Sequence, residues 1–265
     1  MSETALLDVD QRGVATLTLN RPDVRNAFDN DLIAKITGLL VELQARTDVR
    51  VVILTGAGTS FSSGADINWM RAMADFSEEQ NYEDALQLAE LMATLNHLTK
   101  PTIGRINGHV FGGGVGLVCC CDIAIAASEA LFCLSEVRLG LVPAVISPYV
   151  IDAVGPRNAR RFFLSAEPMS ARKARRVGLV HEVAKTGKLD VAVEDQVTML
   201  LKGGPSALRE SKELVHTVSG HSFTADLALK KRTAEIIAQM RVSDEGQEGL
   251  KAFLQKRSPR WCEKP

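Results

Sequence analysis

The chain has 265 residues, of which 46% are hydrophobic and 24% charged, so it can bury a substantial core as one large domain or two modest ones. Its 31 basic residues are balanced by 32 acidic ones, which argues against recruitment of nucleic acid or an anionic membrane surface. No apolar run approaches the roughly 20 residues that span a bilayer, and the first residues lack the apolar core of a signal peptide. These features predict a cytoplasmic protein with a small-molecule ligand.

The first two thirds of the chain alternate short strands with helices, in repeated units of two strands and a helix. Strands are predicted at 6–10, 13–20, 51–56, 101–107, 122–127 and 131–136, and helices at 30–46, 67–76 and 78–98. The first two strands form a hairpin, and a loop rich in glycine and serine covers residues 57–66. This alternation is typical of an α/β fold.

From Gly155 onward the pattern becomes helical, and only residues 179–184 still resemble a strand. Helices are predicted at 156–167, 170–178, 189–203, 206–220, 223–240 and 244–257. The helices beyond Gly204 carry apolar stripes with little core left to cover, and such stripes often pack on another subunit. We therefore divide the chain into a core over residues 1–203 and a C-terminal helical region over 204–265, and we expect a homo-oligomer.

Five cysteines are present, and three of them, Cys119 to Cys121, are adjacent. Neighbours on a helix are turned about 100° from one another, so this run cannot close around a metal ion as spaced cysteine pairs can. We predict that these three, with Cys133 and Cys262, are small buried side chains with unpaired thiols. No metal site is expected.

The stretch NGHVFGGGVGLVCCCDIAIA, residues 107–126, opens a predicted helix on three consecutive glycines. A dinucleotide fingerprint needs a glycine at its sixth position, where Leu117 stands, and the GK[ST] ending of a P-loop is absent. The glycines either let the helix pack closely or expose N–H groups at a helix N-terminus to a developing negative charge. The second use describes half of an oxyanion hole, and the turn around Gly64 and Ala65 is the candidate for the other half.

Several motifs in order resemble those of the enoyl-CoA hydratase/isomerase (crotonase) family over essentially the whole chain. They are NRPDVRNAF, FSSGADI, KPTIGRINGHVFGGGVGL, CDIAIA, SEVRLGLVP and GLKAFLQKR. The resemblance implies a ClpP-like spiral of ββα units with a C-terminal helical region that trimerises, giving a homotrimer or a dimer of trimers. It also implies an acyl-CoA thioester as ligand, no separate cofactor, and a thioester oxygen held by the N–H groups of Ala65 and Gly113.

The resemblance also indicates the catalytic acids. Hydratases of the family use two glutamates, and the positions that match them are Gly116 and Glu136, so this chain keeps one of the two. The apolar residues around Glu136 are expected to raise its pKa by desolvation. A single carboxylate can add water across a 2,3 double bond, or it can carry a proton between C2 and C4 as an isomerase does. The sequence leaves both reactions open.

A finer resemblance, in GGGVGL and CLSEVRLGLVPAVISPYV, is to bacterial 3-methylglutaconyl-CoA and isohexenylglutaconyl-CoA hydratases. Their branched substrates carry a second carboxylate, for which Arg138, His109, Arg105 and Asn68 are candidate partners. Arg138 also suits a structural ion pair, and His109 suits a packed loop. The sequence thus favours a lyase acting on a branched dicarboxylic enoyl-CoA.

The family's CoA contacts match residues at both ends of the chain. They are Arg25, Ala27, Ala65, Asp66, Ile67, Asn68, Gly113, Phe253 and Lys256. Two other functions are weighed against this one. A eukaryotic relative of the methylglutaconyl hydratases binds AU-rich RNA, but the balanced charge argues against that role. A serine peptidase on the related spiral fold would need a GxSxG elbow and a matching triad, which the sequence does not offer.

Overall fold

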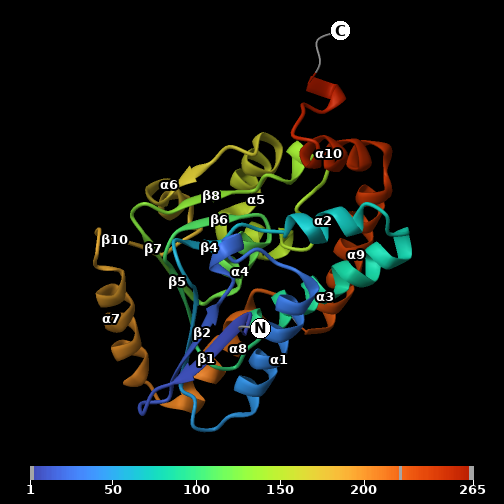
Figure 1. Cartoon of the computed structure of the whole chain (residues 1–265). Helices are drawn as coiled ribbons and strands as arrows, with labels where there is room; N and C mark the ends of the chain where they lie inside the picture. Colours follow the sequence, from blue (N-terminus) through green and yellow to red (C-terminus); the bar gives the residue numbers. More distant parts are fainter. Residues whose placement is uncertain (1–2, 221–222, 263–265) are drawn as a thin grey trace.

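The computed structural model describes residues 3–220 and 223–262, and within them the strands form two sheets (Figure 1). The larger sheet has the order β1 (Ala5–Val9), β2 (Val14–Leu19), β3 (Val51–Gly56), β5 (Thr102–Ile106), β7 (Ile123–Ala127) and β10 (Glu182–Ala184). The smaller sheet has the order β4 (Ser60–Ser62), β6 (His109–Phe111), β8 (Leu131–Cys133) and β9 (Met169–Ser170). The α/β class and the opening hairpin, β1 with β2, are therefore confirmed.

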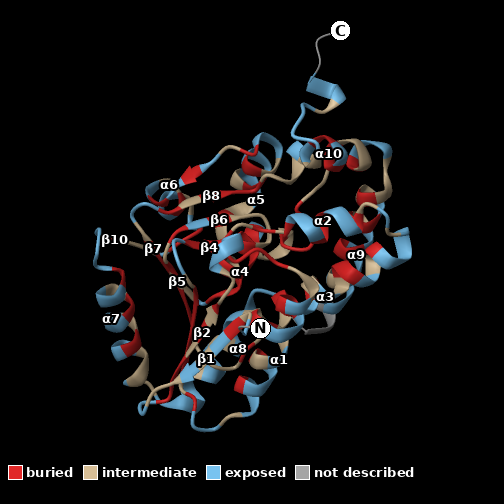
Figure 2. Cartoon of the chain, in the orientation of Figure 1, coloured by how far each residue is buried: buried red, intermediate tan, exposed pale blue. Residues whose placement is uncertain are grey.

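Helices cover both faces of the larger sheet. Alternate residues of β3 point to opposite faces, so Val52 and Leu54 join the main core while Val51 and Ile53 join a second cluster. The main core is covered by α1 (Asn30–Ala45) and α3 (Glu78–Asn96), and the second cluster by α7 (Leu189–Leu201). Figure 2 shows the buried strands lying between α7 on one side and α1 on the other. This explains why the first four residues of β3 are all apolar: both faces of the strand are buried.

The smaller sheet differs from the sequence prediction. Residues 57–66 were expected to form a loop, but they contain β4, and β6 follows β5 after a two-residue turn. Both strands have three residues, which is too short to show a period-two pattern. The two short helices that border the pocket described below are α2 (Ile67–Met73) and α4 (Gly113–Cys120).

The C-terminal part of the chain is helical, as predicted. It contains α5 (Ser147–Ser165), α6 (Ala171–Val177), α8 (Pro205–Val218), α9 (Phe223–Val242) and α10 (Asp244–Leu254). The helix predicted at 156–167 is part of the longer α5, which begins at Ser147 and is interrupted at Gly155, where φ is 74°. Helix α9 packs along α3, whereas no residue of α8 is buried and Val218 is 78% exposed. The uncovered face of α8 fits the predicted oligomer, which stays a prediction.

The cysteines follow the prediction with one exception. Cys120, Cys121 and Cys133 are buried, and Cys119 is partly buried. The prediction for Cys262 is wrong, because this residue lies exposed in a short 3-10 helix, Arg260–Cys262, after α10. Among the described residues, no helix has the length and apolarity needed to cross a membrane.

Candidate active site

Three parallel strands of the smaller sheet bring the predicted catalytic residues to one place. β4 pairs with β6, and β6 pairs with β8, in both cases in parallel. Because the carboxyl ends of parallel strands meet at one edge of a sheet, the segments that follow them lie together. These segments carry Ala65, Gly113 and Glu136, each two or three residues after its strand ends. A hydrogen bond of 3.0 Å from the Gly112 N–H to the Cys133 carbonyl ties two of the segments directly.

The backbone around Ala65 turns its N–H toward the pocket. Phe28 donates its N–H to the Gly64 carbonyl and accepts from the Asp66 N–H, both at 2.7 Å. In a parallel pairing of this kind, the residue between the two bonded ones directs its N–H to the opposite side. Gly113 is the first residue of α4, so its N–H has no acceptor within the helix. Neither N–H donates a hydrogen bond to any described residue, and both residues line the same pocket.

Two glycines are required by the backbone at this point. Gly112 has a φ of 51° and a ψ of −124°, a combination that side-chain-bearing residues rarely adopt. Gly64 has a φ of 83°, and a Cβ there would lie 3.1 Å from the Phe111 carbonyl oxygen. The glycine-rich turn therefore serves the close approach of two backbone segments, and it leaves the first N–H of α4 accessible.

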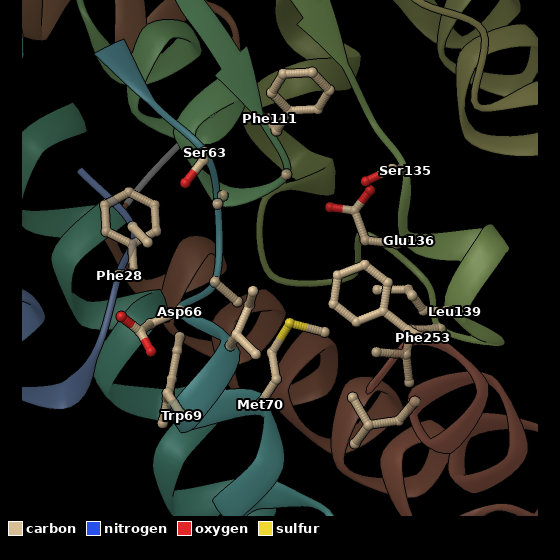
Figure 3. Close-up of a pocket in the computed structure, with 18 of the residues that line it drawn as sticks. Phe28, Ser63, Asp66, Trp69, Met70, Phe111, Ser135, Glu136, Leu139 and Phe253 are labelled. Carbon is tan, nitrogen blue, oxygen red and sulfur yellow. The ribbon is translucent and has the colours of Figure 1, made fainter. Parts of the chain in front are cut away.

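The pocket has a volume of about 1080 Å³ and is mostly apolar. Figure 3 shows Glu136, Leu139 and Phe253 on one wall and Phe28, Trp69 and Met70 on the opposite one. The C-terminal helices α9 and α10 complete it with Ile237, Arg241, Leu250 and Phe253. A cavity of this size, with few polar groups, suits an organic ligand rather than an ion.

Glu136 is the carboxylate that this pocket encloses. It opens a 3-10 helix, Glu136–Leu139, directly after β8, and its Oε2 atom is buried with no hydrogen-bond partner among the described residues. Burial raises the pKa of Glu136 to about 7, and its own backbone N–H offsets part of that effect. A carboxyl group with this pKa can exchange a proton in either direction at neutral pH, which is what a general acid–base catalyst requires.

The position that matches the family's other glutamate has no room for a side chain. A Cβ on Gly116 would lie 2.3 Å from Cγ2 and 2.9 Å from Cβ of Ile146, which is itself a buried residue of the pocket wall. Real Cβ atoms essentially never approach other atoms so closely. An apolar side chain from the segment before α5 thus occupies the space that a second carboxylate would need.

Most of the residues predicted to contact the ligand do line the pocket. They are Arg25, Ala27, Ala65, Asp66, Ile67, Asn68, Gly113, Glu136, Arg138 and Phe253. The Asp66 carboxylate, however, caps α2 through the Asn68 N–H and pairs with Arg21 at 3.0 Å, so it is already engaged within the protein. Arg138 is exposed, and its guanidinium donates to the Ala166 carbonyl at 2.9 Å.

Three candidates lie outside the pocket lining. His109 is exposed on β6, and Lys256 is exposed after α10 with a φ of 55°. Arg105 on β5 is engaged with Asp190 at 2.7 Å and with the Thr55 hydroxyl at 3.2 Å. The structure therefore does not support His109 and Arg105 as ligands for a substrate carboxylate, because neither residue lines the pocket.

Several pocket residues were missed by sequence reasoning. They are chiefly Phe28, Trp69, Met70, Ile237, Arg241 and Leu250. In sequence they read as ordinary helix or strand core, because apolar residues at helical spacing give no sign of whether they face a core or a ligand. Arg241 in particular stands in the last turn of α9, where a basic residue is common.

The sequence model of the enoyl-CoA hydratase/isomerase family matches residues 10–264. The chain belongs to the enoyl-CoA hydratase/isomerase family. The 2,3-dehydroadipyl-CoA hydratase of Escherichia coli is 32% identical to it, over 94% of this chain and 95% of the relative. A crystal structure of an enoyl-CoA hydratase from Shewanella pealeana has a TM-score of 0.80 and 43% identity, over 98% of this chain and 96% of the other. A second, from Mycobacterium avium, has a TM-score of 0.84 and 36% identity, over 98% and 100%.

Membership of the enoyl-CoA hydratase/isomerase family fits the geometry above. It supports hydration of an enoyl-CoA in general, and it confirms the crotonase fold that the motifs predicted. In this chain, Ile146 packs against Gly116, the position that the motifs match to the second glutamate.

Proposed function

We propose that this protein adds water across the 2,3 double bond of a branched, dicarboxylic enoyl-CoA of the 3-methylglutaconyl type, with Glu136 as the acid–base group. The observation that carries the proposal is an enclosed carboxylate, Glu136, whose Oε2 atom has no partner among the described residues, in a pocket that also exposes two backbone N–H groups with no acceptor among them. Ala65 and Gly113 supply those donors. Neither donor titrates, so the site keeps its positive character at every pH that the fold tolerates.

The reaction then proceeds in two proton transfers at one residue. The Glu136 carboxylate takes a proton from water while the water oxygen bonds to C3. The C2–C3 π electrons form a C1–C2 double bond, and the carbonyl π electrons move onto the thioester oxygen to give an enolate. The two N–H groups hold that oxygen, and each such donor is worth about 3 to 4 kcal/mol of transition-state stabilisation in comparable sites. The protonated Glu136 next returns its proton to C2, and the thioester carbonyl re-forms. The CoA arrives as part of the substrate, and no other cofactor takes part.

A second candidate is Δ3,Δ2-enoyl-CoA isomerisation. It is favoured by the packing of Ile146 against Gly116, which leaves no room for a second catalytic carboxylate at that position. An isomerase needs only a group that removes a proton from C2 and delivers it to C4, and the same enolate would form on the same two donors. Water need not be held in place for this reaction.

A panel of purified substrates separates the two reactions. Crotonyl-CoA, 3-methylglutaconyl-CoA and a 3-enoyl-CoA are each assayed for loss of the conjugated double bond, which reports hydration, and for its appearance, which reports isomerisation. Hydration of the branched diacid above the other two supports the proposal, whereas a double-bond shift without hydroxyacyl product supports the isomerase. Glu136→Gln is expected to abolish either reaction while it still binds acyl-CoA, and near-normal turnover by that variant contradicts the role of Glu136.

The assembly is part of the same proposal. We infer a homotrimer or a dimer of trimers, supported by the exposed apolar residues Leu214, Val215 and Val218 on α8. Sedimentation of the purified protein tests it, and a monomer at micromolar concentration would contradict it.

A further inference from the structure

The apolar part of the pocket contains a buried arginine. Arg241, near the end of α9, is 9% exposed and lines the pocket beside Ile237, Leu250 and Met70, which are all buried. The other pocket arginines among the described residues differ from it: Arg25, Arg138 and Arg257 are all exposed. Water therefore reaches the side chains of these three arginines. Arg241 therefore puts a positive charge where the rest of the surrounding wall is hydrocarbon, which proteins rarely do without a partner.

One nitrogen, Nη1, makes all of the hydrogen bonds that the Arg241 side chain forms with the described residues. Nη1 donates to Oδ2 of Asp84 on α3 at 2.7 Å, and it lies 3.4 Å from the Asn81 side-chain oxygen. The second oxygen of Asp84 accepts from Nε1 of Trp69 on α2 at 3.0 Å, and the Trp69 ring lies 6.0 Å from the guanidinium carbon. In Figure 1, α9 lies alongside α3, from which Asp84 and Asn81 come. The guanidinium is thereby held in one orientation before any ligand binds.

The opposite edge of the guanidinium is unused. Nε and Nη2 donate no hydrogen bond to any described residue, yet neither is among the atoms that are sealed from solvent. These two nitrogens form the side-on edge of an arginine, whose two parallel N–H bonds match the two oxygens of a carboxylate. Arg241 lines the pocket, so this edge is the part of its guanidinium that remains available to a ligand.

We propose that the Nε–Nη2 edge of Arg241 binds the second carboxylate of a dicarboxylic acyl-CoA. This inference rests on the proposed function, because it places the second carboxylate of that substrate. It assigns the role to a residue from the C-terminal helical region instead of Arg138, whose guanidinium donates to the Ala166 carbonyl. A monocarboxylic acyl chain would cover the same edge with hydrocarbon and leave two donors unpaired, so the site selects against it.

The pocket tolerates this cation because Asp84 neutralises it. Burial lowers the pKa of Arg241, and the Asp84 carboxylate acts in the opposite direction. A guanidinium stays protonated in proteins even so. A second carboxylate on the free edge brings the local charge to minus one, and the bidentate hydrogen bonds in a water-poor site offset the repulsion by Asp84.

The test compares substrates that differ in charge and little in shape. Glutaconyl-CoA and 2,3-dehydroadipyl-CoA are each paired with the monomethyl ester of the distal carboxylate, and kcat/KM for hydration is measured for all four. The wild-type protein is expected to prefer at least one diacid over its ester by tenfold or more. The Asp84→Asn, Arg241→Met double variant removes both charges and leaves no buried unpaired carboxylate, and it is expected to reduce that preference at least tenfold.

The ratio of kcat/KM between a diacid and its ester separates a change in specificity from damage to the fold, since a general loss of activity lowers both values equally. Arg232→Met is the matched control, because Arg232 is an exposed arginine of the same helix outside the pocket lining, and it is expected to leave the preference within threefold of wild type. Arg138→Met tests the competing assignment. A double variant that keeps the wild-type preference, or a loss of preference in Arg138→Met alone, overturns the assignment to Arg241.

The outcomes also distinguish this inference from the proposed function. If the wild-type protein hydrates the esters as well as the diacids, hydration stands and the carboxylate site at Arg241 is refuted. If it hydrates none of the four, nor crotonyl-CoA, the proposed function itself fails. Binding of glutaryl-CoA against butyryl-CoA by calorimetry then still reports on the subsite, because these saturated thioesters need no turnover. Equal affinities there would refute it.

Discussion

The enclosed Glu136 carboxylate should make the protein less stable at alkaline pH, and removing its charge should reverse this. Its pKa is about 7 in the folded protein against an ordinary 4.5. Because one pKa unit corresponds to about 1.36 kcal/mol, ionised Glu136 costs the folded state about 3 kcal/mol relative to the unfolded chain. Burial causes this cost, and the same burial gives Glu136 a pKa that suits proton transfer.

The free energy of unfolding falls as the pH rises because the pKa of Glu136 is higher in the folded protein than in the unfolded chain. A carboxyl whose folded pKa is raised contributes stability that is fully present below pH 4.5 and is lost as the pH rises through about 7. Glu136→Gln keeps the shape and never ionises. Its advantage over wild type in the free energy of unfolding is therefore expected to grow from about 1 kcal/mol at pH 5 to about 3 kcal/mol at pH 8.

Urea unfolding of both proteins at pH 5 and pH 8, at one protomer concentration, measures this difference. Glu129→Gln is the control, because Glu129 is exposed and its pKa is lowered by hydrogen bonds from Ser128 and Thr186. Replacing Glu129 should change the pH dependence of the free energy of unfolding weakly and in the opposite direction. An advantage of Glu136→Gln that is the same at both pH values would show that Glu136 ionises normally, and the argument from its enclosure would fail.

Two further predictions follow from the same site. The value of kcat/KM for hydration is expected to fall as the pH drops through about 7, because only ionised Glu136 can take a proton from water, and a flat profile from pH 6 to 8 would contradict this. Gly116→Glu is expected to lower the free energy of unfolding by about 1 to 3 kcal/mol or more and to give no faster hydration, because its Cβ meets Ile146. Adding Ile146→Gly should recover part of that stability in urea unfolding, and a Gly116→Glu protein of wild-type stability would refute the clash.

Most of the helices and strands could be predicted from local patterns in the sequence. The 3.6-residue spacing of apolar side chains in α1, α3 and the C-terminal helices predicted those elements, because a helix must bury one face. The strands of the larger sheet were predicted from short apolar runs such as the VVIL of β3, because a strand that is buried on both faces is apolar at successive positions. The three-residue strands β4 and β6 were missed, because their pairing with neighbours, rather than their own composition, makes them strands.

The sequence by itself determined which residues are available: a lone acid at Glu136 in apolar surroundings, glycines at the start of α4, and the ordered motifs of the family. Only the tertiary structure decided that Ile146 fills the space beside Gly116, and that Arg241 presents a free edge while Asp84, 157 residues away in sequence, holds it. The physical reason is that periodicity and backbone preference act over a few residues. Which side chain occupies a given space depends on how distant segments pack.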